Sequence, residues 1–177
     1  MKPVIIAIAG ASGSGKTTLS KYLQHKYGIP AIVSTTTRPR RADEREGEDY
    51  FFVSSTRGIS KKAMLTYTRF GKHGYFSRKS QLPASGYCTY VVDENGIRAL
   101  KQAAGTEYDV FTVYISCRTE NLPSRGVDAE RIERDRTRPQ VDYSLIDVVL
   151  GNNGTETEFR KGADQLMQII EQWQHLR

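Results

Sequence analysis

Residues 10–17, GASGSGKT, form the feature that most restricts what this chain can fold into. They match the pattern G-x-x-x-x-G-K-[ST] at every fixed position. The apolar, β-branched run before them (residues 4–9) predicts a strand buried on both faces, and a helical pattern runs from Gly15 to Gly28. Strand, glycine-rich loop and helix form the context in which this pattern binds phosphate. We therefore expect backbone N–H groups and the positive helix end to bind the phosphates of a nucleoside triphosphate.

The remaining buried segments extend this unit into a single α/β domain. Further apolar runs predict strands at residues 31–33, 90–92, 110–115 and 147–150. Helical patterns lie at 94–104 and 128–137, and apolar residues at helical spacing from Phe159 to Trp173 predict a final amphipathic helix. Strands that alternate with helices predict a P-loop core with a parallel sheet flanked by helices. A length of 177 residues suits one domain.

Residues 34–87 interrupt the alternation, so we interpret them as an inserted lobe. They contain the β-like residues 50–53, a possible helix after Ser54, and β-like pieces around Tyr67 and Tyr75. The highly charged residues 120–138 predict a helical arm. The expected division is therefore a core of residues 1–33, 88–117 and 139–177, the lobe 34–87 and a short lid 118–138.

Charge is distributed unevenly along the chain. The 26 basic and 20 acidic residues give a net charge of +6, which suggests an anionic partner. Residues 50–92 carry seven basic residues and no acidic residue. This concentration in the lobe favours a small phosphorylated ligand, and we expect neither nucleic acid nor a membrane as partner.

Several classes of protein are disfavoured by composition. Two cysteines, Cys88 and Cys117, are too few for a disulfide framework and lack the spacing of a zinc site. No apolar run reaches the roughly 18–20 residues of a membrane span, and the N-terminus does not have the pattern of a signal peptide. A cytoplasmic location is the expectation.

A second motif lies after the second predicted strand. Arg38, Arg41 and the hydroxyl of Tyr50 are spaced so that they can close around a phosphate monoester, since the planar arginine fork binds phosphate in a bidentate manner. Residues 34–53 match S-x-T-T-R-x-x-R-x-x-E-x-x-G-x-D-Y-x-F-V. Shorter matches follow at residues 70–77, 92–96 and 147–152.

These motifs together resemble those of the guanylate kinases, P-loop enzymes that transfer phosphate from ATP to GMP. The likeness extends over most of the chain. It implies a nucleoside monophosphate kinase that converts GMP or dGMP to the diphosphate, with Mg²⁺ as cofactor, and it implies that the lobe binds the acceptor.

The donor site can be placed on individual residues. Lys16 is expected to reach the β- and γ-phosphates, and the Thr17 hydroxyl is expected to bind Mg²⁺. The residues expected to bind ATP are Gly10, Ala11, Ser12, Gly13, Ser14, Gly15, Lys16, Thr17, Thr18 and Asn152.

The resemblance also implies an acceptor site. Its residues are Ser34, Arg38, Arg41, Tyr50, Tyr75, Ser77 and Asp93. The two arginines and the two tyrosines match residues that hold the acceptor phosphate. Ser34 matches a hydroxyl that hydrogen-bonds the base, and Ser77 matches the small hydroxyl residue after the second tyrosine. Asp93 matches a carboxylate near the guanine amino group. Its place just after a strand would also allow it to hold water on Mg²⁺, but we favour the role near the base.

The lid is expected to supply catalytic arginines. Arg125 and Arg131 look like the matching positions, with Arg134 as the rival candidate and Arg136 and Arg138 also available. The spacing is shorter than in typical members, so a trimmed lid is expected.

The base end of the acceptor site departs from the family pattern. Typical members carry a Glu a few residues before Phe70-Gly71 that reads guanine, whereas no acidic residue occurs from Tyr50 to Val92. Phe76 replaces a glycine and could stack on a base, and Val91 replaces a carboxylate. Two alternatives therefore stay open: another nucleotide or phosphorylated small molecule as acceptor, and a non-catalytic binding module. The complete glycine loop disfavours the latter.

Overall fold

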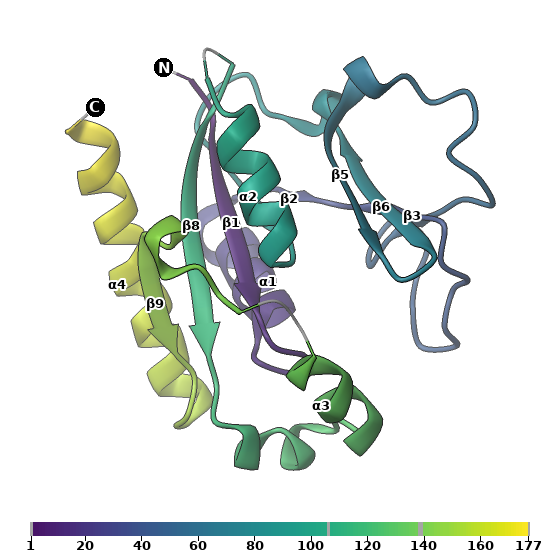
Figure 1. The fold of residues 1–177 in the computed structure, drawn as a ribbon. Helices are drawn as coiled ribbons and strands as arrows, with labels where there is room; N and C mark the ends of the chain where they lie inside the picture. The colour runs from purple at the N-terminus through teal and green to yellow at the C-terminus, as the bar shows by residue number, and fades with distance from the viewer. Residues whose placement is uncertain (1, 106, 138–139, 177) are drawn as a thin grey trace.

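The centre of the molecule is a five-stranded sheet with strand order β2-β7-β1-β8-β9, in which every neighbouring pair is parallel. The computed structural model describes residues 2–105, 107–137 and 140–176. The strands are β1 (Val4–Gly10), β2 (Ala31–Ile32), β7 (Tyr87–Val91), β8 (Asp109–Ser116) and β9 (Val148–Gly151). Helices lie on both faces of this sheet (Figure 1). The predicted α/β fold with a helix-flanked parallel sheet is confirmed.

The alternation of side chains along β1 explains why its sequence is apolar without interruption. Val4, Ile6 and Ile8 pack in one core with α1 (Lys16–Tyr27) and α4 (Glu156–His175). Ile5 and Ala7 point to the opposite face and pack with α2 (Glu94–Ala103). All five side chains are fully buried, as a strand covered by helices on both faces requires.

Local signals set the ends of the helices. Gly28 adopts the left-handed conformation (φ 68°) and its N–H bonds to the Gln24 carbonyl, which ends α1. Thr155 and Glu158 form a reciprocal capping box at the start of α4. None of the helices within the described residues is long and apolar enough to cross a membrane.

A second sheet, with strand order β4-β3-β6-β5, is formed by part of the inserted segment. Its strands are β3 (Thr35–Thr36), β4 (Phe51–Phe52), β5 (Met64–Phe70) and β6 (His73–Arg78). The antiparallel pair β5–β6 turns at Gly71, whose φ is +58°. Leu65 of β5 is buried in the same core as Leu100 of α2, which anchors this sheet to the central one.

One expected element is absent. Residues 54–63, all of them described, hold a single 3₁₀ turn (Lys61–Ala63) and no α-helix. Gly58 in this stretch has a φ of +78°, which belongs to a turn and interrupts a helix. Further 3₁₀ turns lie at Lys79–Gln81 and Tyr143–Leu145.

The charged arm contains the helix predicted at residues 128–137, and before that helix it is less regular than the sequence predicts. It consists of two 3₁₀ turns (Thr119–Asn121 and Pro123–Arg125) and α3 (Ala129–Arg136), which lies past the ends of β1 and β8 beside the glycine loop (Figure 1). Asp128 caps α3 by accepting a hydrogen bond from the Arg131 N–H. Arg138 and the expected lid boundary lie outside the described residues, and the division into core, lobe and lid stays a prediction.

Candidate active site

The glycine loop connects β1 to α1 in a conformation that only glycine allows at its key positions. Gly13 and Gly15 have φ values of +71° and +110°. A Cβ atom at Gly15 would lie 2.5 Å from Asn152 Nδ2, which donates a hydrogen bond to the Ser14 carbonyl. Asn152, which follows β9, therefore holds the glycine loop in place. It also lies near the expected ATP site.

Lys16 opens α1 and points back over the loop. Its Nζ donates hydrogen bonds to the carbonyls of Gly10 (2.9 Å) and Ala11 (2.7 Å). Lys16 also lines two hollows on the surface. One of these hollows is lined by expected ATP residues, among them Thr17, Thr18 and Asn152.

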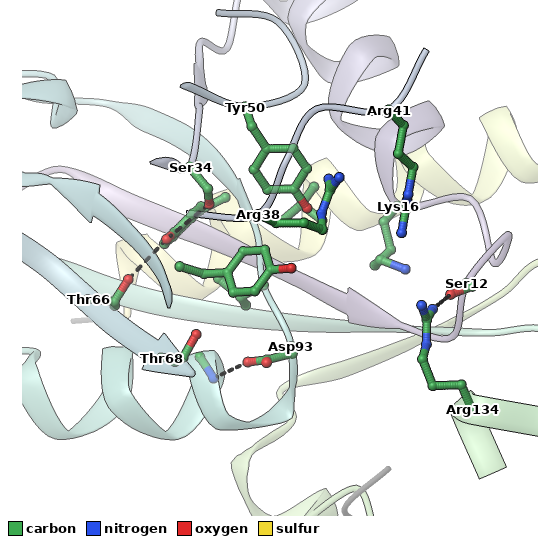
Figure 2. A pocket seen from close by; sticks show the side chains of 15 residues that line it. Ser12, Lys16, Ser34, Arg38, Arg41, Tyr50, Thr66, Thr68, Asp93 and Arg134 are labelled. Carbon is green, nitrogen blue, oxygen red and sulfur yellow. Dashed lines mark hydrogen bonds between the residues drawn. The ribbon is translucent and has the colours of Figure 1, made fainter. Parts of the chain in front are cut away.

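The other hollow opens between the two sheets and brings distant segments together (Figure 2). One end is cationic and the other end carries hydroxyl groups. Its lining includes Ser12, Lys16 and Arg134 at the loop and lid, Arg38, Arg41, Tyr50 and Tyr75 in the middle, and Ser34, Thr66, Thr68, Tyr90 and Asp93 at the far end. All expected acceptor residues except Ser77 therefore line one cavity.

Glu44 fixes the two arginines of the acceptor segment. Its carboxylate accepts two hydrogen bonds from the Arg38 guanidinium, at 2.5 and 2.9 Å, and one from the Arg41 backbone N–H at 2.8 Å. Burial disfavours its charged form, but the hydrogen bonds from Arg38 and Arg41 outweigh burial and lower the pKa of Glu44. The family pattern contains this Glu without assigning it a role, so its positioning function was not visible in the sequence.

Two tyrosines stand between the arginines and the far end of the cavity. The rings of Tyr50 and Tyr75 meet edge to face with centroids 6.0 Å apart, and the Arg38 guanidinium lies 5.4 Å from the centroid of Tyr50. Burial raises the pKa of Tyr50, and Tyr75 raises it further. Tyr50 thus stays protonated at neutral pH and can donate a hydrogen bond to a phosphate.

The far end of the cavity holds a network of hydroxyl groups. The Tyr90 hydroxyl lies 3.0 Å from Thr66 Oγ1 and accepts a hydrogen bond from Ser34 Oγ at 3.4 Å. Ser77 is fully buried on the strand beside Thr66, with the two hydroxyl oxygens 3.4 Å apart. No binding role was predicted for Thr66 or Tyr90 from the sequence. The β-like piece around Tyr67 was the available signal, because Thr66 and Thr68 share one face of such a strand.

Phe76 and Asp93 were both expected near the base, and the structure treats them differently. Phe76 is fully buried and does not line the cavity, because it follows Tyr75 on a strand and points to the opposite face. Stacking of Phe76 on a base therefore has no support in the structure. Asp93 lines the cavity and also caps α2, since its Oδ1 accepts a hydrogen bond from the Gly96 N–H at 2.7 Å.

The lid arginines occupy three different places. Arg134 lies in the cavity, where its Nη2 donates a hydrogen bond to Ser12 Oγ at 3.2 Å (Figure 2). Arg125 reaches the other hollow and donates a hydrogen bond to the Asn152 carbonyl at 2.8 Å. Arg131 lines neither hollow and pairs with Asp128 across 3.5 Å. Of the three expected candidates, Arg134 is thus the one that shares a cavity with the acceptor residues.

Comparison with known proteins supports the resemblance drawn from the motifs. The sequence model of the guanylate kinase family matches residues 1–172. Guanylate kinase of Neisseria gonorrhoeae is 32% identical over 180 residues, covering 94% of this chain and 86% of that protein. Guanylate kinase of Legionella pneumophila (strain Lens) is 29% identical over 177 residues, covering 92% and 83%.

A solved structure shares the fold. The crystal structure of guanylate kinase from Anaplasma phagocytophilum superposes with a TM-score of 0.66 at 22% identity, covering 96% of this chain and 86% of that chain. The family match over nearly the whole length confirms the identification made from the two motifs, and the chain belongs to the guanylate kinase family.

Proposed function

We propose that this protein transfers the γ-phosphoryl group of ATP to the phosphate of GMP. The observation that carries this proposal is the position of Lys16, which lines both the hollow with Asn152 and the cavity with Arg38 and Arg41. A donor phosphate held by the glycine loop and an acceptor phosphate held by the arginine pair would meet beside the Lys16 ammonium. The names of the two relatives described above agree with this reaction.

Positioning and charge neutralisation supply most of the rate in such a reaction. Arg38 and Arg41, oriented by Glu44, would hold the acceptor phosphate, with Tyr50 and Tyr75 beside it. The nucleophile is an ionised phosphate oxygen, so the protein needs no general base. Lys16 would leave the Gly10 and Ala11 carbonyls to bind the donor phosphates.

The chemistry of the donor set fits Mg²⁺ bound together with the nucleotide. Thr17 presents an exposed hydroxyl beside Lys16 in the hollow expected to take ATP. Within the described part of the chain, no group of three or more His, Cys, Asp or Glu side chains could hold a metal by itself. Mg²⁺ commonly retains waters and takes few protein ligands alongside phosphate oxygens. When bound, it would neutralise charge on the phosphates.

The lid would complete the site. Arg134 would contact the transferring group, because it lines the cavity with Arg38 and Arg41, and Arg125 would lie on the ATP side, because it lines the hollow with Asn152. Closure around the phosphates would exclude water and so suppress wasteful hydrolysis. The cytoplasmic location and the expectation that no nucleic acid binds stay predictions.

Steady-state formation of ADP and GDP from ATP, Mg²⁺ and GMP tests the proposal. We expect turnover by the wild-type protein and a loss of at least about 100-fold in Lys16→Ala, because the phosphates lose their nearest cation. Lys21→Ala is the matched control, since Lys21 lies on the same helix and lines neither the hollow with Asn152 nor the cavity with Arg38 and Arg41, which is the proposed acceptor cavity. ATP binding without turnover of any nucleoside monophosphate would favour a binding module instead.

A further inference from the structure

The hydroxyl-lined end of the acceptor cavity differs chemically from a site that reads guanine through a carboxylate. Asp93 is the one acidic side chain among the described residues that line this cavity. Thr66, on β5, lies before Phe70-Gly71, in the stretch where typical family members carry their guanine-reading Glu. Its side chain is buried within the cavity wall, with the residue 7% exposed.

The strand register shows why Thr66 faces the ligand space. On the β5–β6 pair, Thr66 lies opposite Ser77 and Thr68 lies opposite Tyr75. Side chains two residues apart on a strand share a face, so Thr66 and Thr68 both line the cavity. Tyr67 lies between them on the other face and is 46% exposed.

Tyr90 holds the Thr66 hydroxyl in place. It comes from β7 of the central sheet and is 3% exposed, and its hydroxyl lies within hydrogen-bond distance of Thr66 and Ser34. The network therefore links the two sheets at the floor of the cavity. Every member is a neutral hydroxyl that can rotate.

This neutrality has a direct consequence for base recognition. An ionised carboxylate only accepts hydrogen bonds, so it favours the N1–H of guanine and repels the N1 lone pair of adenine. A hydroxyl both donates and accepts, so it satisfies either N1 by rotating. The hydrogen bond from a neutral hydroxyl to guanine N1–H and the one to adenine N1 differ by at most about 1.5 kcal/mol. This difference corresponds to roughly tenfold in the ratio of kcat/KM for the two acceptors.

We propose that Thr66 is a specificity-determining residue and that the acceptor site takes adenine as well as guanine nucleoside monophosphates, with Tyr90 as the positioning residue. The inference rests on the proposed phosphoryl transfer and extends its substrate class. The remaining oxygen of Asp93 is able to accept from an exocyclic amine, which lies on C2 in guanine and on C6 in adenine, so the two bases would present it from opposite sides of N1.

Competition between GMP and AMP for phosphorylation by ATP tests the inference on the wild-type enzyme. We expect the kcat/KM values of these two acceptors to lie within about tenfold of each other. A preference for GMP over AMP above about 1000-fold overturns the inference and leaves the proposed function standing. Absence of turnover with every purine monophosphate, with ATP still bound, overturns the proposed function itself.

Substitutions at Thr66 test which residue sets the ratio. Thr66→Glu should raise the preference for GMP over AMP by at least about 30-fold, since a fixed acceptor leaves the adenine N1 facing a carboxylate. Thr66→Ser keeps the hydroxyl and should keep the wild-type ratio. If Thr66→Glu has wild-type thermal stability and leaves the preference for GMP over AMP unchanged, the role of Thr66 is contradicted. If that variant does not fold, the preference of the wild-type enzyme still decides the inference.

Tyr90→Phe tests the positioning role. We expect the KM of each purine acceptor to rise about threefold to tenfold while the KM for ATP stays constant, because only the acceptor end loses a hydrogen bond. Tyr108→Phe is the matched control, since Tyr108 is 1% exposed, lies outside the cavity and has a hydroxyl without a partner in the described structure. Equal effects of both substitutions on acceptor KM contradict a specific role for Tyr90.

Discussion

The carboxylate of Asp135, on the lid helix, accepts a hydrogen bond of 2.6 Å from the backbone N–H of Ser12 in the glycine loop. Asp135 is buried at this contact, with its side chain 8% exposed, and Arg134 lies beside it at 3.4 Å. A carboxylate oxygen thus occupies a donor that the loop would offer to a phosphate. ATP must displace Asp135 to use this N–H group.

Asp135→Asn should therefore tighten ATP binding. The amide oxygen is a weaker competitor than the carboxylate because its hydrogen bond lacks charge assistance, a difference of about 1 kcal/mol or roughly fivefold in Kd. Titration calorimetry with ATP and Mg²⁺ in the absence of acceptor measures the effect. Glu133→Gln on the exposed face of α3 is the control and should leave Kd unchanged, whereas weaker binding in Asp135→Asn would contradict the competition.

Arg134 should matter more for turnover than Arg131. Arg134 lines the acceptor cavity and contacts Ser12, whereas Arg131 pairs with Asp128 outside it. An arginine that stabilises charge in phosphoryl transfer is worth about 10³-fold or more in kcat, so Arg134→Met should lose at least about 100-fold and Arg131→Met far less. Pre-steady-state phosphoryl transfer measures the loss, with the exposed Arg98→Met as control, and the reverse order would assign the catalytic role to Arg131.

Glu44→Gln should weaken acceptor binding without affecting ATP. The substitution removes charge from the group that orients Arg38 and the Arg41 backbone, so we expect a rise of about tenfold in acceptor KM at constant KM for ATP. Because the pKa of Glu44 is lowered in the folded protein, this organisation is present above the unfolded pKa and is lost as pH falls through the folded value. Glu48→Gln, an exposed position in the same segment, is the control.

The strands, the glycine loop and the position of Arg38 and Arg41 in one cavity were predictable because their signals are local. Six consecutive apolar residues before a glycine pattern need no knowledge of distant segments to be interpreted as a buried strand with a phosphate loop. The same reasoning failed after Ser54, where one turn-forming glycine, Gly58, replaced the expected helix with irregular chain.

The contacts between distant segments were not predictable in this way. Tyr90 and Thr66 are 24 residues apart and belong to different sheets, and Asp135 is 123 residues from Ser12. Such pairs depend on how the sheets and the lid pack. The sequence showed only that residues 50–92 lack a carboxylate, whereas the structure shows which hydroxyl groups line the acceptor cavity in that region.

Gly13→Ala should weaken both ATP binding and lid docking. Gly13 has a φ of +71°, and an added Cβ would lie 2.2 Å from Val127 Cγ2, which is buried against the loop. Backbone strain and overpacking together should cost on the order of 2 kcal/mol. Thermal unfolding and ATP titration measure the loss, and Gly13→Ala/Val127→Ala should recover part of it. Gly105→Ala, where an added Cβ meets nothing within 4 Å, is the control.

Asp164 on α4 should make the stability of the protein depend on pH well below neutrality. Its carboxylate accepts hydrogen bonds from Lys26 Nζ (2.7 Å) and from the hydroxyls of Tyr22 and Tyr27 (2.8 Å each), which ties α1 to α4. The hydrogen bond from Lys26 is the largest cause that lowers the pKa of Asp164 to about 2. A carboxyl whose pKa is depressed by folding stabilises the protein above its unfolded pKa of about 3.9, and this contribution is lost as pH falls toward 2.

Asp164→Asn should therefore lower Tm by on the order of 2 °C at pH 7, with a smaller difference as the pH approaches 2. Thermal unfolding of both proteins between pH 7 and pH 2 measures this convergence, and a Tm difference that stays constant across the range would show that the ionised carboxylate does not join the two helices.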